Sequence, residues 1–486
     1  MSDDPSDGDP FDTGAVRQRV LAGWRAAAVR FREDANAEED LALGGYRDRL
    51  VVELAQNAAD AAARAGVDGR LLLRLTDLED GPVLVAANTG AALDDAGVEA
   101  LSTLRASAKR GDASTVGRFG VGFAAVLGVS DEPAVLSRHG GVRFSAADTR
   151  DLVTHAAAGT PALAEELARR DGHVPVLRLP FPAEGTPPEG YDTAVVLPLR
   201  DAVAEDLVVR LLDEVGDALL VALPALAEVM LELPGREPRT VRDVAARWHV
   251  VRRSGRFADA LLADRPTEER ARTAWSLTWA LPAAGSALPS PASHRDGPAT
   301  GSLLMAEQAG GGSLLMAEQS TAPRTQVLHA PTPSDEPLPW PALLVGTFPL
   351  DPSRRHVAPG PATDALVREA AAGYADLLTE VAAAGRTPWD LVPVGLPAGV
   401  LDGALRSALA DLLPGTAFLV AAEQPEPGPD GAPPAVLRPR DAVALDPPAG
   451  ADAAVVVALA PTVAGLVLVP RAARAAADLV GVRRVE

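Results

Sequence analysis

The first half of the chain alternates between helical and strand-like patterns of hydrophobic positions. A period near 3.6 from Ala15 to Phe31 predicts a helix, and the charged residues 32–40 then predict a loop. A second helix is predicted over residues 44–66, where Gly66 supplies a common C-terminal stop. Short apolar or alternating runs predict strands. Two of them lie within 70–90, one on each side of a turn, and four more are predicted at 133–137, 141–144, 174–182 and 192–200. A further helix is predicted at 202–221.

The second half has a different pattern, in which short strands recur along the chain. They are predicted at 226–233, 247–254, 274–281, 325–331 and 342–348, which indicates a mostly antiparallel α+β domain. A stretch rich in Pro, Ser and Gly interrupts this domain at 282–324 and carries GSLLMAEQ twice, at 301–308 and 312–319. Two copies are too few for a repeat fold, so we expect a mobile loop that contains a duplication.

The last part of the chain predicts a smaller unit of α/β type. Helices at 363–384 and 400–412 precede strands at 417–422, 454–460 and 465–470. The chain as a whole is therefore predicted to be α+β. We expect a disordered tail at 1–13 and domains at 14–222, 223–360 and 361–486. The final residues read like the middle of a domain, so we expect the last unit to be truncated.

Composition narrows the classes of function. With 486 residues, of which 47% are hydrophobic, the chain is long enough for more than one packed domain. A formal net charge of −21 argues against broad contacts with nucleic acid or anionic membranes, because phosphate binding needs a basic surface. The chain has no cysteine, which excludes disulfides and thiolate metal sites. It shows neither a signal-peptide pattern nor a long apolar run, so we expect a cytoplasmic protein.

Glu53, Asn57 and Asp60 form the most unusual polar feature of the sequence. Asparagine is rare in this chain, and the spacing of these residues puts all of them on one stripe of a helix made mostly of Ala, Val and Leu. Such a stripe is ordinarily a solvated face. Burial of a carboxylate without a partner is costly, so a ligand, metal or water network explains this stripe better. A glutamate can act as a general base on water, and an asparagine oxygen can ligate Mg²⁺.

Two glycine-containing turns follow this helix. Asn88-Thr89-Gly90 ends a predicted strand, and GRFGVGF at 117–123 precedes an apolar run that we expect to be helical. A glycine-rich turn at a helix N-terminus can present backbone N–H groups to phosphates. The chain contains neither the Rossmann spacing nor a P-loop, which excludes the two commonest nucleotide folds. The only lysine, Lys109, lies shortly before the second turn.

In this order, the motifs resemble those of the GHKL ATPases, and most of all those of the heat-shock-protein-90 chaperones and sacsin. The matching segments are ELAQNAADA (53–61), NTG (88–90), SAK (107–109) and GRFGVGF (117–123). The resemblance implies a Bergerat α/β sandwich that binds ATP and Mg²⁺. It implies that Glu53 activates the attacking water, that Asn57 holds Mg²⁺ and phosphate oxygens, and that Asp60 supports the nucleotide.

The same resemblance assigns nucleotide contacts outside the helix. Asn88 and Gly90 match the motif that reads adenine, and Thr193 matches a threonine that joins the adenine site. A lid over ATP is implied by Lys109 and by the glycine box, whose contact residues are Gly117, Gly120, Val121, Gly122 and Phe123. The sequence departs from the family at three positions. Asn88 and Ala92 stand where the adenine-reading motif Asp-x-Gly-x-Gly has its aspartate and its second glycine, and Asp192 stands where the family has a glycine before the threonine. An asparagine still offers adenine both an acceptor and a donor.

Residues 339–360 resemble the segment that follows the ATPase domain in sacsin, which implies a transducer or middle-like second domain. In the chaperone family a middle-domain arginine reaches the γ-phosphate, and the candidates here are Arg354 and Arg355. A planar guanidinium suits this role because it can bind phosphate oxygens in a bidentate way. The alternative is a surface pair in a chain that contains 44 arginines.

Together these features predict a weak, Mg²⁺-dependent ATPase whose lid and domains close around ATP. The predicted output is chaperone-like remodelling of a protein client that the sequence does not identify, and a homodimer is compatible with it. Two alternatives stay open: a nucleotide-sensing scaffold with little hydrolysis, and a MutL-like component of a repair or defence assembly. The negative charge disfavours direct DNA contact in the MutL-like alternative.

Overall fold

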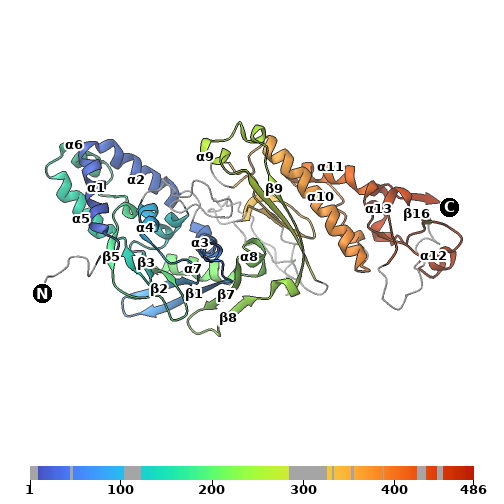
Figure 1. The fold of residues 1–486 in the computed structure, drawn as a ribbon, viewed down its shortest axis with the longest axis horizontal. Coiled ribbons are helices and arrows are strands. Elements are labelled where there is room, and N and C mark those ends of the chain that lie inside the picture. The colour runs from blue at the N-terminus through green and yellow to red at the C-terminus, as the bar shows by residue number, and fades with distance from the viewer. Residues whose placement is uncertain are drawn as a thin grey trace, which may run out of the picture.

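The computed structural model describes residues 9–43, 47–102, 122–283, 326–330, 333–351, 355–386, 388–423, 434–445 and 453–485. Over these residues the chain is elongated, with the N-terminal part at one end and the C-terminal part at the other (Figure 1). It combines helices with mostly antiparallel sheets, so the predicted α+β class is confirmed. Within the described ranges, no helix has the length and apolar character needed to cross a bilayer.

An eight-stranded sheet organises the first part of the molecule. Its strand order is β5-β4-β3-β6-β2-β1-β7-β8, and all neighbours are antiparallel except β1 and β7. The strands are β1 (Gly69–Leu78), β2 (Gly81–Asn88), β3 (Ala134–Ser137), β4 (Gly140–Arg143), β5 (Phe181–Ala183), β6 (Thr193–Pro198), β7 (Leu226–Glu232) and β8 (Arg239–Arg242). The predicted turn between β1 and β2 is confirmed, because Leu78 pairs directly with Gly81.

Helices cover one face of this sheet (Figure 1). Leu71, Leu73 and Leu75 of β1 belong to the main core, whereas Leu72 packs on the opposite face with Met230, as the alternation of side chains along a strand requires. The helices are α1 (Thr13–Ala26), α2 (Ala28–Leu43), α3 (Leu50–Ala65), α4 (Asp95–Ser102), α5 (Ala146–Ala157), α6 (Pro161–Arg169), α7 (Ala202–Asp213) and α8 (Asp217–Ala222). Shorter 3₁₀ turns are η1 (Arg47–Arg49), η2 (Phe123–Gly128) and η3 (Val176–Arg178).

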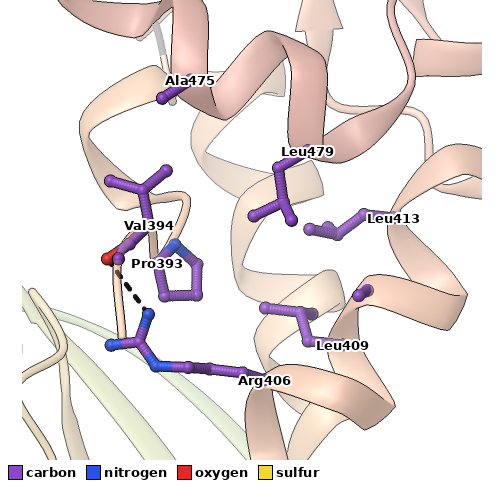
Figure 2. A pocket seen from close by; sticks show the side chains of 9 residues that line it. Pro393, Val394, Arg406, Leu409, Leu413, Ala475 and Leu479 are labelled. Atoms are coloured by element: carbon purple, nitrogen blue, oxygen red, sulfur yellow. Dashed lines mark hydrogen bonds between the residues drawn. The ribbon is translucent and has the colours of Figure 1, made fainter. Parts of the chain in front are cut away.

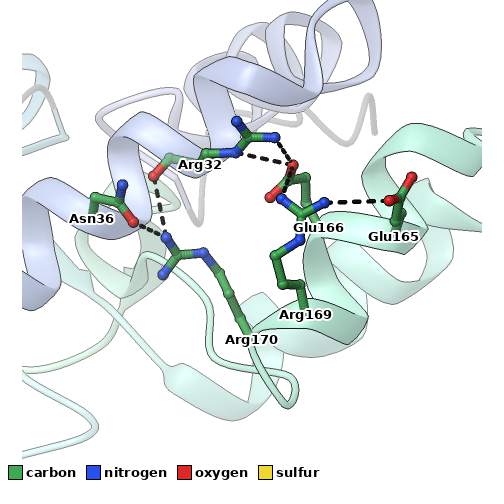
Figure 3. A network of polar contacts seen from close by, with 6 residues as sticks. All are labelled: Arg32, Asn36, Glu165, Glu166, Arg169 and Arg170. Carbon is green, nitrogen blue, oxygen red and sulfur yellow. Dashed lines mark hydrogen bonds and ion pairs between the residues drawn. The ribbon is translucent and has the colours of Figure 1, made fainter.

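Helices α1, α2, α5 and α6 form a satellite cluster with its own small core around Trp24 and Phe31. Figure 3 shows the polar side of this cluster, where Arg32 and Asn36 of α2 face the glutamates and arginines of the α6 region. The guanidinium of Arg32 donates from Nε to Oε1 of the buried Glu166 at 3.0 Å. These hydrogen bonds hold the pKa of Glu166 below its usual value. The ion pairs Arg32–Glu166 and Arg170–Glu39 therefore connect α2 to α6 and its C-terminal end.

The structure corrects three predictions in this part of the chain. Residues 32–40 are not a loop but part of α2, which starts after an extended break at Ala27. Their charges lie mostly on the exposed side of the helix, while Phe31, Ala35 and Glu38 are buried. The predicted helix at 202–221 is divided into α7 and α8 at Gly216, and the strand predicted at 174–182 is mainly the turn η3 followed by the short β5. Residues 1–8 of the predicted tail lie outside the described residues, whereas Phe11 is buried in the main core.

A second sheet has the strand order β12-β11-β13-β10-β9. Its strands are β9 (Trp248–Arg256), β10 (Ala274–Pro282), β11 (Val327–His329), β12 (Pro333–Pro337) and β13 (Leu343–Gly346). The strand predicted at 226–233 does not belong here: it is β7, which pairs with β1 in the first sheet. The helix η4 (Val244–Ala246) follows β8, and η5 (Asp259–Leu262) and α9 (Thr267–Arg270) connect β9 to β10. The two GSLLMAEQ copies lie outside the described residues.

The C-terminal residues share one hydrophobic core with the second sheet. Helix α10 (Pro361–Ala383) packs across β9 and β10, and α11 (Val400–Leu412) packs along α10. At the centre of this core, Trp279 stacks on Trp340 at a centroid distance of 5.1 Å, and both contact Tyr374. The indole of Trp340 donates to the buried carboxylate of Asp402 at 2.6 Å, which attaches α11 to the sheet.

Beyond α11 the secondary structure departs from the prediction. Residues predicted as a strand at 454–460 form the helix α12 (Ala453–Leu459), and those at 465–470 form only isolated bridges. The remaining elements are η6 (Trp389–Leu391), η7 (Leu413–Gly415), β14 (Leu419–Val420), β15 (Val436–Leu437), η8 (Pro439–Asp441), β16 (Val443–Leu445), η10 (Arg471–Ala473), α13 (Arg474–Val480) and β17 (Arg483–Val485). A hollow of about 200 Å³ lies between α11 and α13. Figure 2 shows the side chains that line it, most of them apolar, such as Leu409 and Leu479.

Candidate functional site

Helix α3 carries the predicted polar stripe into the core of the first domain. The helix forms because most of residues 50–65 are good helix formers, chiefly Ala and Leu, and Gly66 ends it in the left-handed conformation at φ 66°. Glu53 is 7% exposed and Asp60 only 1%, while Asn57 is partly exposed. The stripe is therefore not a solvated face. Two buried carboxylates on one helix require polar partners or a ligand.

Gly122 lies directly against the carboxylate of Glu53. A Cβ atom at position 122 would overlap Oε2 of Glu53 and approach its Cδ to 3.0 Å, so only glycine leaves this space open. Gly122 immediately precedes η2, which packs against α3. The contact joins the end of the predicted glycine box to the predicted catalytic glutamate. Because Glu53 is also in the first turn of α3, the helix dipole favours its negative charge.

The loop after β2 presses on α3 close to Asp60. Gly90 has φ 126°, a conformation that side-chain-bearing residues rarely adopt. A Cβ atom at this position would lie 2.5 Å from the backbone carbonyl group of Ala61. The next residue, Ala91, donates its N–H to the carbonyl oxygen of Ala61 at 2.9 Å. The structure thus brings the Asn88-Thr89-Gly90 motif together with the stripe on α3.

Asn88 and Thr193 face each other across β2 and β6. They are register partners in this antiparallel pair, and both are buried, with exposures of 8% and 9%. The side-chain amide of Asn88 donates to the carbonyl oxygen of Thr89 at 3.2 Å, which leaves its Oδ1 as an acceptor. The hydroxyl of Thr193 is buried and has no hydrogen-bond partner among the described residues. A buried hydroxyl without a partner is costly, so a ligand that bonds to it would remove a penalty.

Part of the predicted site lies outside the described residues: Lys109, Gly117, Gly120, Val121 and Arg354. Phe123 is described, and its side chain is 3% exposed in the main core, where it packs against Phe144. Only its backbone is thus available for a ligand. No cluster of three or more His, Asp or Glu side chains that could hold a metal occurs among the residues that the structure covers.

Arg355 lies in the segment between β13 and α10, and its guanidinium donates to the carboxylate of Asp335 in β12 at 2.6 Å. The same strand contacts the first domain, because Arg49 donates from Nη2 to the carbonyl oxygen of Pro333 at 3.4 Å. Arg49 immediately precedes α3. A single strand therefore connects the segment of Arg355 to the start of the helix that carries Glu53.

Sequence reasoning missed a buried network next to this site. Glu38 accepts hydrogen bonds from the backbone N–H groups of Val176 and Leu177 at 2.6 and 3.2 Å. Arg178 is 3% exposed and donates to the carbonyl oxygen of Ser102, the last residue of α4, at 2.7 Å. Burial raises the pKa of Glu38 to about 7. The sequence contained a signal for this burial, because the spacing of Phe31, Ala35 and Glu38 puts them on one face of a helix.

Fold and site together define an α+β protein in which loops from distant parts of the chain converge on one polar stripe of a buried helix. Residues 42–155 match a family model described as Sacsin domain. This span contains Glu53, Asn57, Asp60, Asn88 and the whole glycine box, so the predicted similarity to sacsin is confirmed for this region. A comparison with curated protein sequences gives no significant match.

Proposed function

We propose that the first domain is a GHKL-type ATPase domain with a Bergerat fold, and that it binds ATP with Mg²⁺ beside α3. One observation carries this proposal: β2 and β6 pair Asn88 with Thr193, whose buried hydroxyl has no partner among the described residues. An adenine base offers both a hydrogen-bonding amino group and ring nitrogen acceptors. Asn88 Oδ1 would accept from the amino group, and the Thr193 hydroxyl would be satisfied at the same edge.

The stripe on α3 then supports the rest of the nucleotide. In this proposal Asp60 supports the nucleotide, and Asn57 ligates Mg²⁺ through its amide oxygen without adding negative charge near phosphates. When bound, Mg²⁺ would neutralise charge on the phosphate oxygens. Lys109 and the backbone of the glycine box would complete the phosphate site, as the resemblance to GHKL ATPases implies.

Hydrolysis needs a base next to the terminal phosphate, and Glu53 is the candidate. Its carboxylate would take a proton from water while the water oxygen bonds to the γ-phosphorus and the bond to the ADP oxygen breaks. The products are ADP and phosphate. Arg355 or Arg354 would stabilise the negative charge that spreads over the transferred phosphate. The Asp335–Arg355 pair is an exposed one, so it would cost little to exchange Asp335 for a phosphate.

ATP-driven closure would couple the two sheets through β12, which contacts both Arg49 and Arg355. We propose that this motion remodels a protein partner, in the manner of a chaperone acting in the cytoplasm. Neither nucleic acid nor membrane contact is part of the proposal. A homodimer is compatible with the mechanism.

Binding and turnover of Mg-ATP by the wild type and by Glu53→Ala test the proposal. We expect similar binding by calorimetry, and at least about a hundredfold lower turnover for Glu53→Ala, the usual effect of losing a general base. Glu205→Ala is a matched control, because Glu205 also lies in the first turn of a helix but on α7. Its turnover should equal that of the wild type. A wild type that binds no Mg-ATP contradicts the proposal as a whole.

A nucleotide-sensing scaffold is the second candidate. It is favoured by one departure from the family motif, since Asn88 and Ala92 stand where the resemblance leads us to expect aspartate and glycine. If the wild type binds Mg-ATP but turns it over no faster than Glu53→Ala, the scaffold is the correct description. Asn88→Asp then shows whether the departure is the cause, because it restores the family residue.

A further inference from the structure

Asp192 occupies a position where the resemblance to the GHKL family leads us to expect glycine, and its side chain has definite partners. Oδ2 accepts the backbone N–H of Gly90 at 2.8 Å, and Oδ1 accepts a hydrogen bond from the guanidinium of Arg138. The backbone N–H of Asp192 donates to the carbonyl oxygen of Asn88 at 2.9 Å. One residue therefore holds both ends of the Asn88-Thr89-Gly90 turn.

The opposite side of the turn is fixed by the body of the domain. Gly90 presses on the backbone of Ala61, and Ala91 donates to the Ala61 carbonyl oxygen. The backbone N–H of Thr89 donates to the carbonyl oxygen of Arg70 at 3.1 Å, and the Thr89 hydroxyl accepts a hydrogen bond from the backbone N–H of Arg70 at 2.9 Å. The turn is thus clamped between Asp192, α3 and the start of β1. The turn therefore leaves the Asn88 side chain little conformational freedom.

This clamp sets the orientation of the Asn88 amide. The NH₂ group of Asn88 donates to the carbonyl oxygen of Thr89, so Oδ1 is the atom left to meet a ligand. An acceptor in this place matches the 6-amino group of adenine and opposes the 6-oxo group of guanine. If the Asn88-Thr89-Gly90 turn were mobile, the Asn88 amide could rotate by about 180° and present its NH₂ group to the ligand. The 6-oxo group of guanine could then accept a hydrogen bond from this NH₂ group.

We propose that Asp192 is a positioning residue that makes the nucleotide site selective for 6-aminopurines, by locking the turn that orients the Asn88 amide. The inference rests on the proposed ATP site and adds its base specificity. Asp192 is a suitable clamp because a carboxylate gives a charge-assisted hydrogen bond to a backbone N–H, which is stronger than a neutral one. Its charge is balanced by Arg138 and therefore does not repel the phosphates.

The test compares Asp192→Ala with Asp192→Asn in the full chain, by calorimetric titration with Mg-ATP and with Mg-GTP. Asp192→Ala removes the acceptor for the Gly90 N–H, and we expect the preference for ATP over GTP to fall about tenfold, the size of one charged hydrogen bond. Asp192→Asn keeps an oxygen acceptor and should keep the preference. Asp148→Ala is the matched control, because it removes another carboxylate–arginine pair, with Arg143, away from the turn.

Equal weakening of both nucleotides by Asp192→Ala, together with a lower thermal midpoint, would show that Asp192 only supports the fold and would overturn the inference. An unchanged preference would overturn it as well. In both cases the proposed function stands, provided that the wild type binds Mg-ATP. A wild type that binds neither nucleotide would overturn the proposed function and the inference together.

Discussion

The carboxylate of Glu53 lies directly against the α-carbon of Gly122, across a gap that a Cβ atom could enter only by displacing the carboxylate. The two residues come from α3 and from the start of η2, which are far apart in the sequence and packed together in the core. Since Glu53 is buried, its carboxylate cannot move away into solvent without disturbing this packing. The position of the proposed base is therefore set by a glycine.

Gly122→Ala should reduce ATP turnover while leaving the fold intact. The backbone at Gly122 has φ −68° and ψ −35°, which alanine adopts without strain, so the new methyl group acts only by displacing the Glu53 carboxylate. A shift of about 1 Å in a reacting group can cost about a hundredfold in rate, and we expect a loss of at least about tenfold in kcat. Steady-state kinetics and thermal unfolding measure the two effects separately.

Gly159→Ala is the control for this substitution. Nothing lies within 4 Å of a Cβ atom built at Gly159, so its turnover should match that of the wild type. Full activity of Gly122→Ala would mean that the Glu53 carboxylate is not held where the structure places it, or that it is not the base.

The local parts of the fold were predictable from the sequence. Gly66 ends α3 and the Asp80-Gly81 turn joins β1 to β2, because both signals depend only on neighbouring residues. For the same reason, the spacing of Glu53, Asn57 and Asp60 was sufficient to put them on one stripe of a helix. The burial of Glu53 and Asp60 was inferred correctly from the apolar residues around them, whereas Asn57 is partly exposed.

Pairing between distant segments was not predictable. The alternation at 226–232 identifies a strand, but nothing in it says that β7 runs parallel to β1 in the first sheet. The valine-rich run at 454–460 was interpreted as a strand, yet it forms α12 with Val456 as its buried residue. Such a short apolar run has no period that separates helix from strand.

The same distinction applies to the candidate site. The motifs named the residues on α3 and in the turn after β2, but not their contacts with each other. The Glu53–Gly122 packing and the Asp192–Gly90 hydrogen bond both join segments that only the folded chain brings together. From the sequence, Asp192 is only a departure from the glycine expected before Thr193. In the structure it binds the backbone N–H of Gly90 and the guanidinium of Arg138, which gives it a structural role.

Gly90→Ala should destabilise the first domain strongly. The substitution puts a side chain at φ 126° and brings its Cβ atom to 2.5 Å from the backbone of Ala61, so strain and steric overlap add. We expect a loss of about 3 kcal/mol or more in the free energy of unfolding, above the cost of strain alone. Urea unfolding of the full chain measures it.

Gly81→Ala separates the two contributions. Gly81 has a similar φ of 120°, but nothing lies within 4 Å of its Cβ position, so this variant carries the strain without the overlap. Its loss should be smaller, about 1 kcal/mol, the cost of the backbone strain alone. Equal losses for Gly90→Ala and Gly81→Ala would show that the turn does not press on α3.

Thr193→Val should raise stability and lower nucleotide affinity at the same time. Valine has nearly the shape of threonine but lacks the buried hydroxyl, which has no partner among the described residues. Without nucleotide we expect a gain of about 1 kcal/mol in the free energy of unfolding. With saturating Mg-ATP the rise in the thermal midpoint should be smaller than in the wild type, because a ligand contact is lost.

Thr149→Val is the matched control for Thr193→Val. The hydroxyl of Thr149 in α5 is also buried without a partner among the residues that the structure describes. This variant should gain stability in the same way but keep the full effect of Mg-ATP. If both threonine variants respond equally to nucleotide, Thr193 is not part of the site.

Glu38 should make the stability of the first domain fall as the pH rises. Burial is the main cause that raises the pKa of Glu38 from 4.5 to about 7, while Arg178 and the N–H groups of Val176 and Leu177 oppose it. Between these values the folded state binds a proton that the unfolded state has lost, so stability decreases with increasing pH and the penalty is complete above pH 7. The shift corresponds to about 3 kcal/mol. Glu38→Gln cannot ionise and should therefore be more stable than the wild type at pH 8, but not at pH 4.5.

Urea unfolding of both proteins across this pH range tests the assignment, and Glu166→Gln supplies a control of opposite sign. The hydrogen bonds from Arg32 lower the pKa of Glu166, so its ionised form stabilises the fold and this contribution is lost as the pH falls. Glu166→Gln should consequently be less stable than the wild type at neutral pH and approach it in acid. A stability difference between Glu38→Gln and the wild type that does not change with pH would mean that Glu38 keeps an ordinary pKa in the folded protein.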